Sequence, residues 1–265
     1  MKKIWIYSII ALLLSGCENF LDTENLTKKD NSNFPKSAAD AETALTGVYA
    51  LLREMTPGED GQSFFLTAEL LSDDRFGGGG PDDRRMHAVD RLKKVDDNMF
   101  ADVWKQDYRA IYRCNMLLSS MDAIEWENEG VRNKLEGQTR FLRAYFYFDL
   151  CRLFGTVPLI TSTEPVNNPR AAAADLYALI ASDLKTAIEQ LPSTRYSAAN
   201  NAELGRATKW AAEALLARAY LFYTGYYQQE SMPLPEGSLS KTDVITYLDD
   251  CINSSGHDLV GDFRN

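Results

Sequence analysis

The sequence contains little of what most catalytic and metal sites are built from. It has only two histidines and four cysteines in 265 residues, and none of them falls in a Cys-x-x-Cys or other metal-ligand spacing. Gly-x-Ser-x-Gly, His-Glu-x-x-His and acidic calcium-loop motifs are absent too. Adjacent carboxylates such as Asp82 and Asp83 are usually solvated, whereas glycoside hydrolysis needs two carboxylates across a cleft. We therefore expect no enzyme activity, no catalytic residue, no metal and no cofactor.

Positive charge is also scarce. The chain has 28 Lys and Arg against 38 Asp and Glu, for a net charge of -10. Binding to a phosphate backbone needs a concentrated basic face, so nucleic acid is not an expected partner. The 45% of hydrophobic and 11% of aromatic residues are enough to form a packed core and exclude a disordered chain.

Long apolar runs are confined to the first residues of the chain. Two lysines precede an apolar run from Ile4 to Leu14, which is shorter than the roughly 20 residues of a membrane-spanning helix. Leu14-Ser15-Gly16-Cys17 follows and is similar to the bacterial lipobox, although an ordinary signal with a chance cysteine is the alternative. The sequence therefore predicts a lipoprotein signal peptide over residues 1–17, lipid attachment at Cys17 and a polar tether over residues 18–36.

After the tether, the sequence follows a helical period. Apolar residues recur at intervals of three and four, as is typical of amphipathic helices. The predicted helices cover residues 37–54, 99–122, 131–154, 170–191, 205–227 and 241–253. The segment 131–154 is apolar on nearly every side, so we expect it at the centre of the core. Cys114, Cys151 and Cys251 lie beside apolar residues in these helices, which favours buried free thiols over a disulfide.

Residues 57–98 are the least regular part of the sequence. They contain a short apolar run at 64–71 and four glycines at 77–80, and His87 lies in a polar, loop-like context. The glycines do not form a phosphate loop, because no Gly-Lys-Ser/Thr follows them. A loop of this length in a compact domain is usually functional or mobile.

This irregular segment supplies the best candidates for ligand contact. Sugar rings stack their C–H faces on exposed aromatic side chains, and their hydroxyls bond to carboxylate, amide and guanidinium groups. The candidate ligand-binding residues are Phe64, Phe65, Asp73, Asp74, Arg75 and Phe76, with Trp126 from a predicted turn between helices. A place in the core is the alternative for each of these aromatic residues. It is the expected place for Trp104, Tyr108, Tyr145, Phe146, Trp210 and Tyr220.

A short motif recurs along the chain. Arg143-Ala144-Tyr145 and Arg218-Ala219-Tyr220 lie 75 residues apart, each in the first helix of a predicted helix–loop–helix pair. Matching hairpins indicate stacked repeats of the tetratricopeptide kind, although the period is about twice that of the usual repeat. The predicted fold class is all-α, with tetratricopeptide-like stacked helical hairpins and long irregular loops.

Several stretches together resemble the SusD/RagB family, surface lipoproteins that partner TonB-dependent transporters in the nutrient uptake of Bacteroidetes-type bacteria. They match in the family's order over nearly the whole mature chain, which is more specific than any single motif. The stretches are Cys17 to Asp22; Trp104 with Tyr108, Ile111 and Asn115; Arg140 to Phe154 with Gly155, Val157, Pro158 and Leu159; Ser182 to Leu184 with Ala187, Leu191 and Pro192; and Gly205 to Arg218.

The resemblance implies a lipid-anchored protein of the outer membrane, exposed at the cell surface. Such a protein captures oligosaccharides and passes them to a SusC-like TonB-dependent transporter. The resemblance also implies that residues 37–265 form a SusD-like helical domain lacking the family's C-terminal half, so we expect this chain alone to bind oligosaccharide weakly or not at all. Two alternatives stay open: a peptide-capturing member of the same family, and a tetratricopeptide-like scaffold lipoprotein of the envelope.

Overall fold

The computed structural model describes residues 34–54, 64–72, 74–78, 80–93, 100–165, 167–196, 203–259 and 261. The predicted signal peptide, Cys17 and most of the tether lie outside these residues. The α-helices are α2 (Ala38–Glu54), α3 (Phe64–Leu71), α4 (Arg84–Asp90), α5 (Ala101–Ser120), α6 (Glu129–Phe154), α7 (Ala173–Gln190), α8 (Lys209–Tyr226) and α9 (Lys241–Ser254). Short 3-10 helices cover Pro81–Asp83 (η1) and Met121–Ala123 (η2), and β1 (Met232–Pro233) pairs antiparallel with β2 (Ser238–Leu239).

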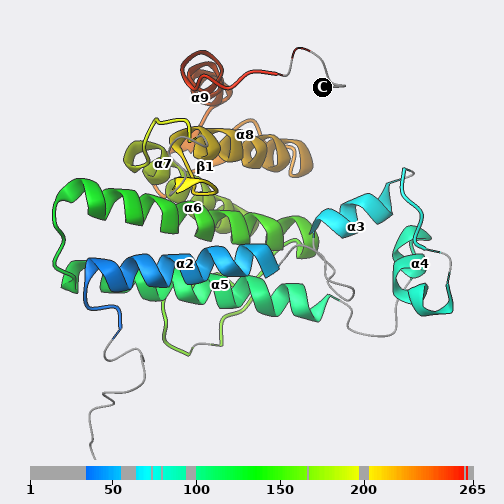
Figure 1. The fold of residues 1–265 in the computed structure, drawn as a ribbon. Coiled ribbons are helices and arrows are strands. Elements are labelled where there is room, and N and C mark those ends of the chain that lie inside the picture. Colours follow the sequence, from blue (N-terminus) through cyan, green and yellow to red (C-terminus); the bar gives the residue numbers. More distant parts are fainter. Residues whose placement is uncertain are drawn as a thin grey trace, which may run out of the picture. The chain divides into compact units, whose positions relative to one another are not determined.

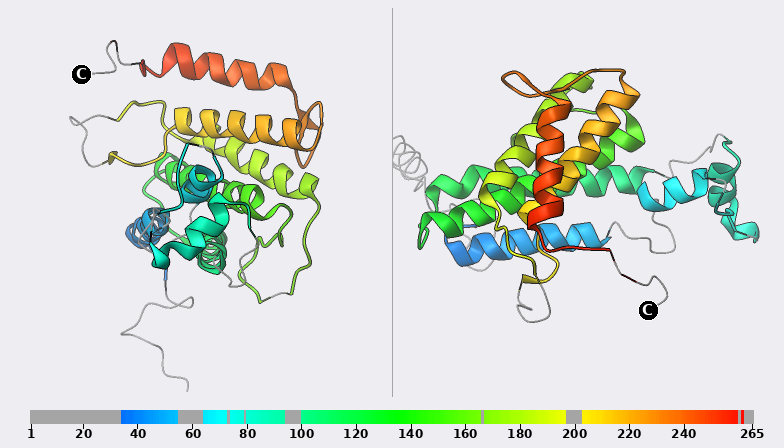
Figure 2. Two further views of the ribbon diagram at one scale, coloured as in Figure 1. Left: turned by 90° about the vertical axis from the view of Figure 1, so that its right-hand side faces the viewer. Right: turned by 90° about the horizontal axis from the view of Figure 1, so that it is seen from above.

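The long helices pack one on the next in a stack. The helix α2 packs against α5 and α6, and α5 packs against α6 (Figure 1). The contacts continue from α6 to α7, from α7 to α8 and from α8 to α9, the outermost helix (Figure 2). Each hairpin thereby buries a face on its neighbour, as in repeat proteins. This arrangement confirms the predicted all-α fold of stacked hairpins.

The helix α6 is the centre of the core, as predicted. The side chains of Leu142, Phe146 and Tyr147 have no exposed surface, and their neighbours come from α2, α5, α7 and α8. Cys114 and Cys151 are buried free thiols, and Cys251 is a partly buried one. Trp210 and Tyr220 are buried as predicted. The side chains of Trp104, Tyr108 and Tyr145 are only half-buried and pack at the edge of the core.

Side-chain caps place two helix starts differently from the prediction. The Oδ1 atom of Asn128 accepts a hydrogen bond from the amide of Val131 at 3.1 Å. Because this bond satisfies an amide of the first turn, Glu129 and Gly130 belong to α6 and not to the predicted turn. Thr208 accepts from the amide of Ala211 in the same way, at 3.3 Å, so α8 begins at Lys209, four residues later than predicted.

The segment predicted to be irregular contains two short helices. Helix α3 covers the apolar run, and His87 lies in α4, not in the loop-like context that we expected. Leu70 of α3 and Val89 of α4 are buried in a small cluster of their own, with Met86 and Phe100 packed against them. The prediction missed these helices because each is too short to show a helical period.

The repeated tripeptide marks the same place in two hairpins but does two different things. Arg143 in α6 is buried, whereas Arg218 in α8 is exposed. The recurrence thus identifies the first helix of the α6–α7 and α8–α9 hairpins without assigning a shared role to its arginine.

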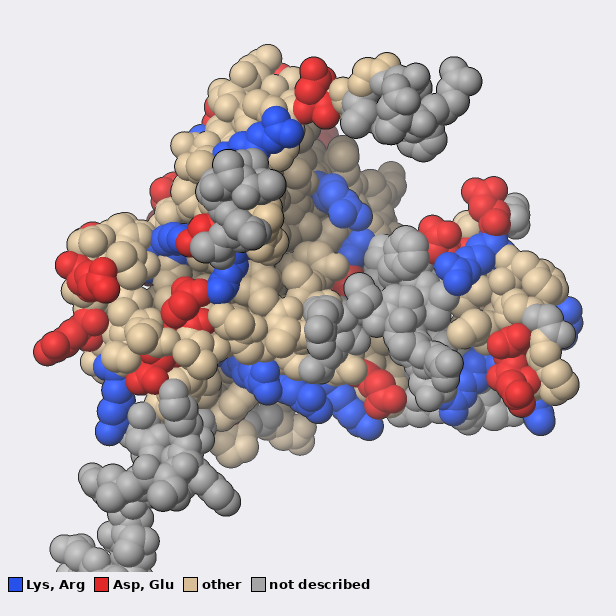
Figure 3. Space-filling model, viewed as in Figure 1, with Lys and Arg blue, Asp and Glu red and all other residues tan. Residues whose placement is uncertain are grey.

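Two surface properties bear on the partners of the protein. Acidic and basic side chains are interspersed over the face in Figure 3, which differs from the concentrated basic face that phosphate backbones require. In the described part of the chain, no helix combines the length and the apolar character needed to cross a membrane.

Candidate ligand-binding site

A pocket of about 510 Å³ lies between α5 and the segment 158–168. This volume is within the range of small-molecule sites, roughly 300–1,000 Å³. The lining residues are Trp104, Tyr108, Ile111, Tyr112, Pro158, Ile160, Ser162, Thr163, Glu164, Pro165, Asn167 and Asn168. The pocket therefore combines an aromatic and aliphatic wall with a polar segment.

The wall on α5 is a row of aromatic rings. Trp104, Tyr108 and Tyr112 are four residues apart, so they lie on one face of the helix. The ring centroid of Trp104 is 5.0 Å from that of Tyr108 and 5.1 Å from that of Phe154, which it meets edge-on. Tyr112, at the open end of the row, is 38% exposed. The three side chains offer apolar surface with hydroxyl groups at its edge, and the rings of Trp104 and Tyr108 are tilted by 52° to each other.

Hydrogen bonds from α5 and α6 hold the start of the opposite wall. The hydroxyl of Tyr108 donates to the carbonyl of Pro158 at 2.8 Å. The hydroxyl of Tyr147 donates to the carbonyl of Ile160 at 2.7 Å and accepts from its amide at 2.8 Å. The Nδ2 atom of Asn115 donates to the same carbonyl at 2.9 Å. Side chains of buried helices thus fix the backbone of residues 158–160.

The end of this segment returns to its start. The Nδ2 atom of Asn168 donates to the carbonyl of Leu159 at 2.9 Å, and the amide of Ala171 donates to the carbonyl of Val157 at 3.0 Å. Pro158 and Arg170 form an isolated antiparallel bridge. A compact loop with close ends is a frequent place for functional residues. We call residues 161–167, of which Val166 is not described, the arch.

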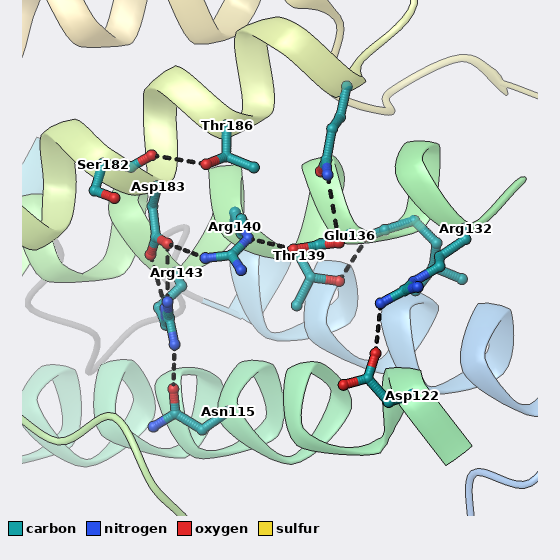
Figure 4. Close-up of polar contacts among 12 residues, drawn as sticks. Asn115, Asp122, Arg132, Glu136, Thr139, Arg140, Arg143, Ser182, Asp183 and Thr186 are labelled. Carbon is teal, nitrogen blue, oxygen red and sulfur yellow. Dashed lines mark hydrogen bonds and ion pairs between the residues drawn. The ribbon is translucent and has the colours of Figure 1, made fainter. Parts of the chain in front are cut away.

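A buried ion pair between α6 and α7 holds the side chain of Asn115 on α5 (Figure 4). The Nε and Nη2 atoms of Arg143 donate to Asp183 of α7 at 2.7 and 2.8 Å. Its Nη1 atom donates to the Oδ1 atom of Asn115 at 2.9 Å. Burial alone would lower the pKa of Arg143, but the hydrogen bonds and charge of Asp183 raise that pKa above its usual value. The charged guanidinium fixes the amide of Asn115, which in turn holds Ile160.

The same network extends along α6. The Nη1 atom of Arg140 donates to Asp183 at 3.0 Å, and its Nε atom donates to Glu136 at 2.7 Å. Asp183 therefore accepts hydrogen bonds from two arginines. Buried charges are tolerated when paired and hydrogen-bonded in this way, so the network joins α5, α6 and α7.

Another buried acid, Asp107, lies beside the pocket wall. Asp107, adjacent to Tyr108 in α5, has no exposed surface, and its carboxylate oxygens have no hydrogen-bond partner in the described structure. Burial, followed by the charge of Asp149, raises the pKa of Asp107 to about 9. Its carboxyl group is therefore protonated at neutral pH.

The candidate residues between α3 and η1 lie outside this pocket. Asp74, Arg75 and Phe76 are exposed, and the ring of Phe76, with 67% exposure, lies 5.7 Å from His87 in an edge-on contact. Phe64 and Phe65 begin α3, but their side chains are outside the described structure. Asp73 is not among the described residues.

Trp126 is not brought together with these residues. Its Nε1 atom donates to the carbonyl of Met121 at 2.9 Å, and its half-buried ring packs against the main core. It precedes the N-terminal end of α6, whereas α3 lies at the other end of that helix (Figure 1). The pocket residues themselves were missed, because periodicity alone assigns Trp104 and Tyr108 to the core. The signal in the sequence that could have indicated this pocket is the four-residue spacing of Trp104, Tyr108 and Tyr112.

The fold and the site together define an all-α protein of stacked helical hairpins with an aromatic-lined pocket on its surface. Residues 19–221 match the SusD-like family, which is described as starch-binding and associating with the outer membrane. Because the match covers most of the sequence, the chain belongs to the SusD-like family.

Individual relatives agree with this assignment. The chain is 31% identical over 228 residues to SusD-like protein P2 of Formosa agariphila, covering 83% of this chain and 43% of that protein. Surface glycan-binding protein A of Bacteroides thetaiotaomicron, solved in complex with laminarihexaose, has a similar fold with a TM-score of 0.70 at 21% identity, covering 86% of this chain and 45% of that one. A laminarin-binding SusD-like protein gives 0.69 at 24% identity, covering 85% and 47%. The chain thus spans about half the length of these relatives.

Proposed function

We propose that this protein is a surface-exposed lipoprotein of the outer membrane that captures oligosaccharides and passes them to a SusC-like TonB-dependent transporter. The observation that carries the proposal is the family match over residues 19–221. The laminarihexaose in the complex of a structurally similar protein supports carbohydrate as the ligand class. Capture without hydrolysis is expected, so incubation with a bound glycan should release no new reducing ends.

The proposed anchor is the lipid on Cys17, which becomes the first residue of the mature chain when the residues before it are cleaved off. Changing Cys17→Ala should release the protein from the membrane fraction or leave it unprocessed in the envelope. Cys251→Ala is the matched control, because it removes a partly buried thiol of the folded body and should not change fractionation. A Cys17→Ala protein that still fractionates with the outer membrane as a processed lipoprotein would contradict the assignment.

The proposed glycan contacts are the exposed residues Asp74, Arg75 and Phe76, with Phe64, Phe65 and Asp73 beside them in the sequence. The exposed ring of Phe76 offers a stacking face, and the neighbouring charges offer hydrogen-bond partners. Trp126 is proposed as a separate contact through the exposed part of its ring.

Affinity electrophoresis in gels containing laminarin or starch tests these contacts. Phe76→Ala should reduce the retardation of the protein by the polysaccharide. Tyr226→Ala is the control, because Tyr226 is a similarly exposed aromatic residue, at 69%, on α8. Equal retardation of the two variants would show that Phe76 does not contact the polysaccharide.

The proposed partner is tested separately from the ligand. The anchored protein, purified from membranes in mild detergent, should bring a TonB-dependent transporter with it. Retention of envelope-assembly proteins in place of a transporter, together with no glycan binding, would favour the scaffold alternative.

A further inference from the structure

We propose that the pocket between α5 and the arch is a second carbohydrate site, which takes one neutral pyranose unit of an oligosaccharide. This inference rests on the proposed glycan capture and adds a site to it. The lining of the pocket shares no residue with the exposed segment Asp74–Phe76.

In this proposal, the aromatic row of Trp104, Tyr108 and Tyr112 gives the pocket its affinity for a sugar ring. The rings of Trp104 and Tyr108 contact each other, and Phe154 holds the Trp104 ring from a further side. A pyranose has an apolar C–H face and an equatorial rim of hydroxyls, so it can cover such a surface while its rim stays polar. Tyr112 extends the row toward solvent, where the next sugar unit would continue.

The opposite wall supplies polar groups for the hydroxyls of that rim. Ser162, Thr163, Glu164 and Asn167 of the arch line the pocket and offer hydroxyl, carboxylate and amide groups. Hydroxyls of a sugar can both donate to and accept from such groups. A purely aliphatic ligand would leave these groups without partners, which disfavours it.

The charge of the pocket restricts the class of sugar. Among the lining residues that the structure describes, Glu164 is the only one with a formal charge, and that charge is negative. A uronate or sulfated sugar would meet this carboxylate without a compensating cation in the lining. A neutral sugar avoids this repulsion, so the site selects against acidic glycans.

The pocket is also held in shape before a ligand arrives. Both ends of the loop are bonded to buried side chains or to each other, through Tyr108, Asn115, Tyr147 and Asn168. A site whose backbone is already ordered loses little conformational entropy on binding. This is the reason that a sugar could be retained by few direct contacts.

The test uses the indole ring of Trp104 as a local reporter. The mature chain is labelled with 5-fluorotryptophan, and the Trp104 signal in its fluorine NMR spectrum is assigned from its loss in Trp104→Phe. Titration with laminarihexaose should shift this signal saturably, whereas a galacturonate hexamer should not. Tyr112→Ala and Asn167→Ala should each weaken the response about tenfold or more, which corresponds to about 1.4 kcal/mol. Tyr226→Ala should leave it unchanged.

The outcomes separate this inference from the proposed function. A Trp104 shift that persists in Phe76→Ala and is weakened in both pocket variants supports a second site. Laminarihexaose binding that is abolished by Phe76→Ala, with a silent Trp104 signal, overturns the second site and leaves glycan capture standing. If no sugar binds, both the second site and the proposed glycan capture are overturned. A Trp104 shift caused by a proline-rich peptide and by no sugar overturns the assignment to carbohydrate.

Discussion

The contribution of the buried ion pair between Arg143 and Asp183 can be tested by measuring the free energy of unfolding of variants. The side chains of the two residues are 7% and 1% exposed. Three variants separate their contributions: Arg143→Met, Asp183→Leu and the double variant. Removing one partner of a buried pair leaves the other charge without compensation, which costs about 3–5 kcal/mol.

The geometry predicts which single change costs more. Without Arg143, Asp183 still accepts a hydrogen bond from Arg140, and the loss is limited to the pair and the contact with Asn115. Without Asp183, Arg143 is left as a buried cation with only the Asn115 oxygen as acceptor. We therefore expect about 5 kcal/mol for Asp183→Leu and about 3 kcal/mol for Arg143→Met.

The double variant shows whether the two effects belong to one interaction. Replacing both ions by apolar side chains removes the uncompensated charge, so the double variant should be more stable than Asp183→Leu. Urea unfolding followed by circular dichroism gives the free energies and the coupling. Additive effects of the two changes, or a larger loss for Arg143→Met than for Asp183→Leu, would refute this account of the network.

Three further changes test other parts of the structure. The raised pKa of Asp107 means that its carboxyl group keeps a proton in the folded state, whereas the unfolded state releases that proton above about pH 4. The free energy of unfolding should therefore fall as pH rises toward about 9, by at most about 1.4 kcal/mol per pH unit. Asp107→Asn should remove this slope, and parallel urea midpoints of both proteins between pH 5 and 8 would contradict it. Phe146→Ala should cost about 3–5 kcal/mol, because the ring is fully buried, and an unchanged thermal midpoint would be incompatible with that burial. Tyr147→Phe should cost about 1–2 kcal/mol and speed hydrogen exchange at the amide of Ile160, its partner; unchanged exchange would mean that the hydroxyl does not hold the loop.

The stacked helical fold could be predicted from the sequence because its signals are long and periodic. Residues 131–154 carry apolar side chains on every face, and the structure surrounds this helix with four others. Helix starts were less accurate, because a single capping side chain such as Asn128 or Thr208 decides them. The short helices α3 and α4 were missed because each contributes one buried residue to a small cluster, too little to show a helical period.

The pocket could not be predicted from local patterns. Periodicity placed Trp104 and Tyr108 in the core, and in the structure they are half-buried because the arch faces them across a cavity. Whether that loop folds back over α5 depends on hydrogen bonds from Asn115 and Tyr147 to Ile160. These contacts join residues that are 45 and 13 positions apart in the chain. Asn115 and Asp183 stood among the residues that carry the family resemblance, but their roles emerge only from the fold.

Isothermal titration of the purified mature chain with laminarihexaose tests oligosaccharide capture most directly. We predict saturable binding that is weak, with a dissociation constant of about 1 mM or tighter, and that is reduced by Phe76→Ala and by Tyr112→Ala. A folded protein that gives no binding heat with laminarihexaose, maltohexaose or any other neutral oligosaccharide would contradict the account.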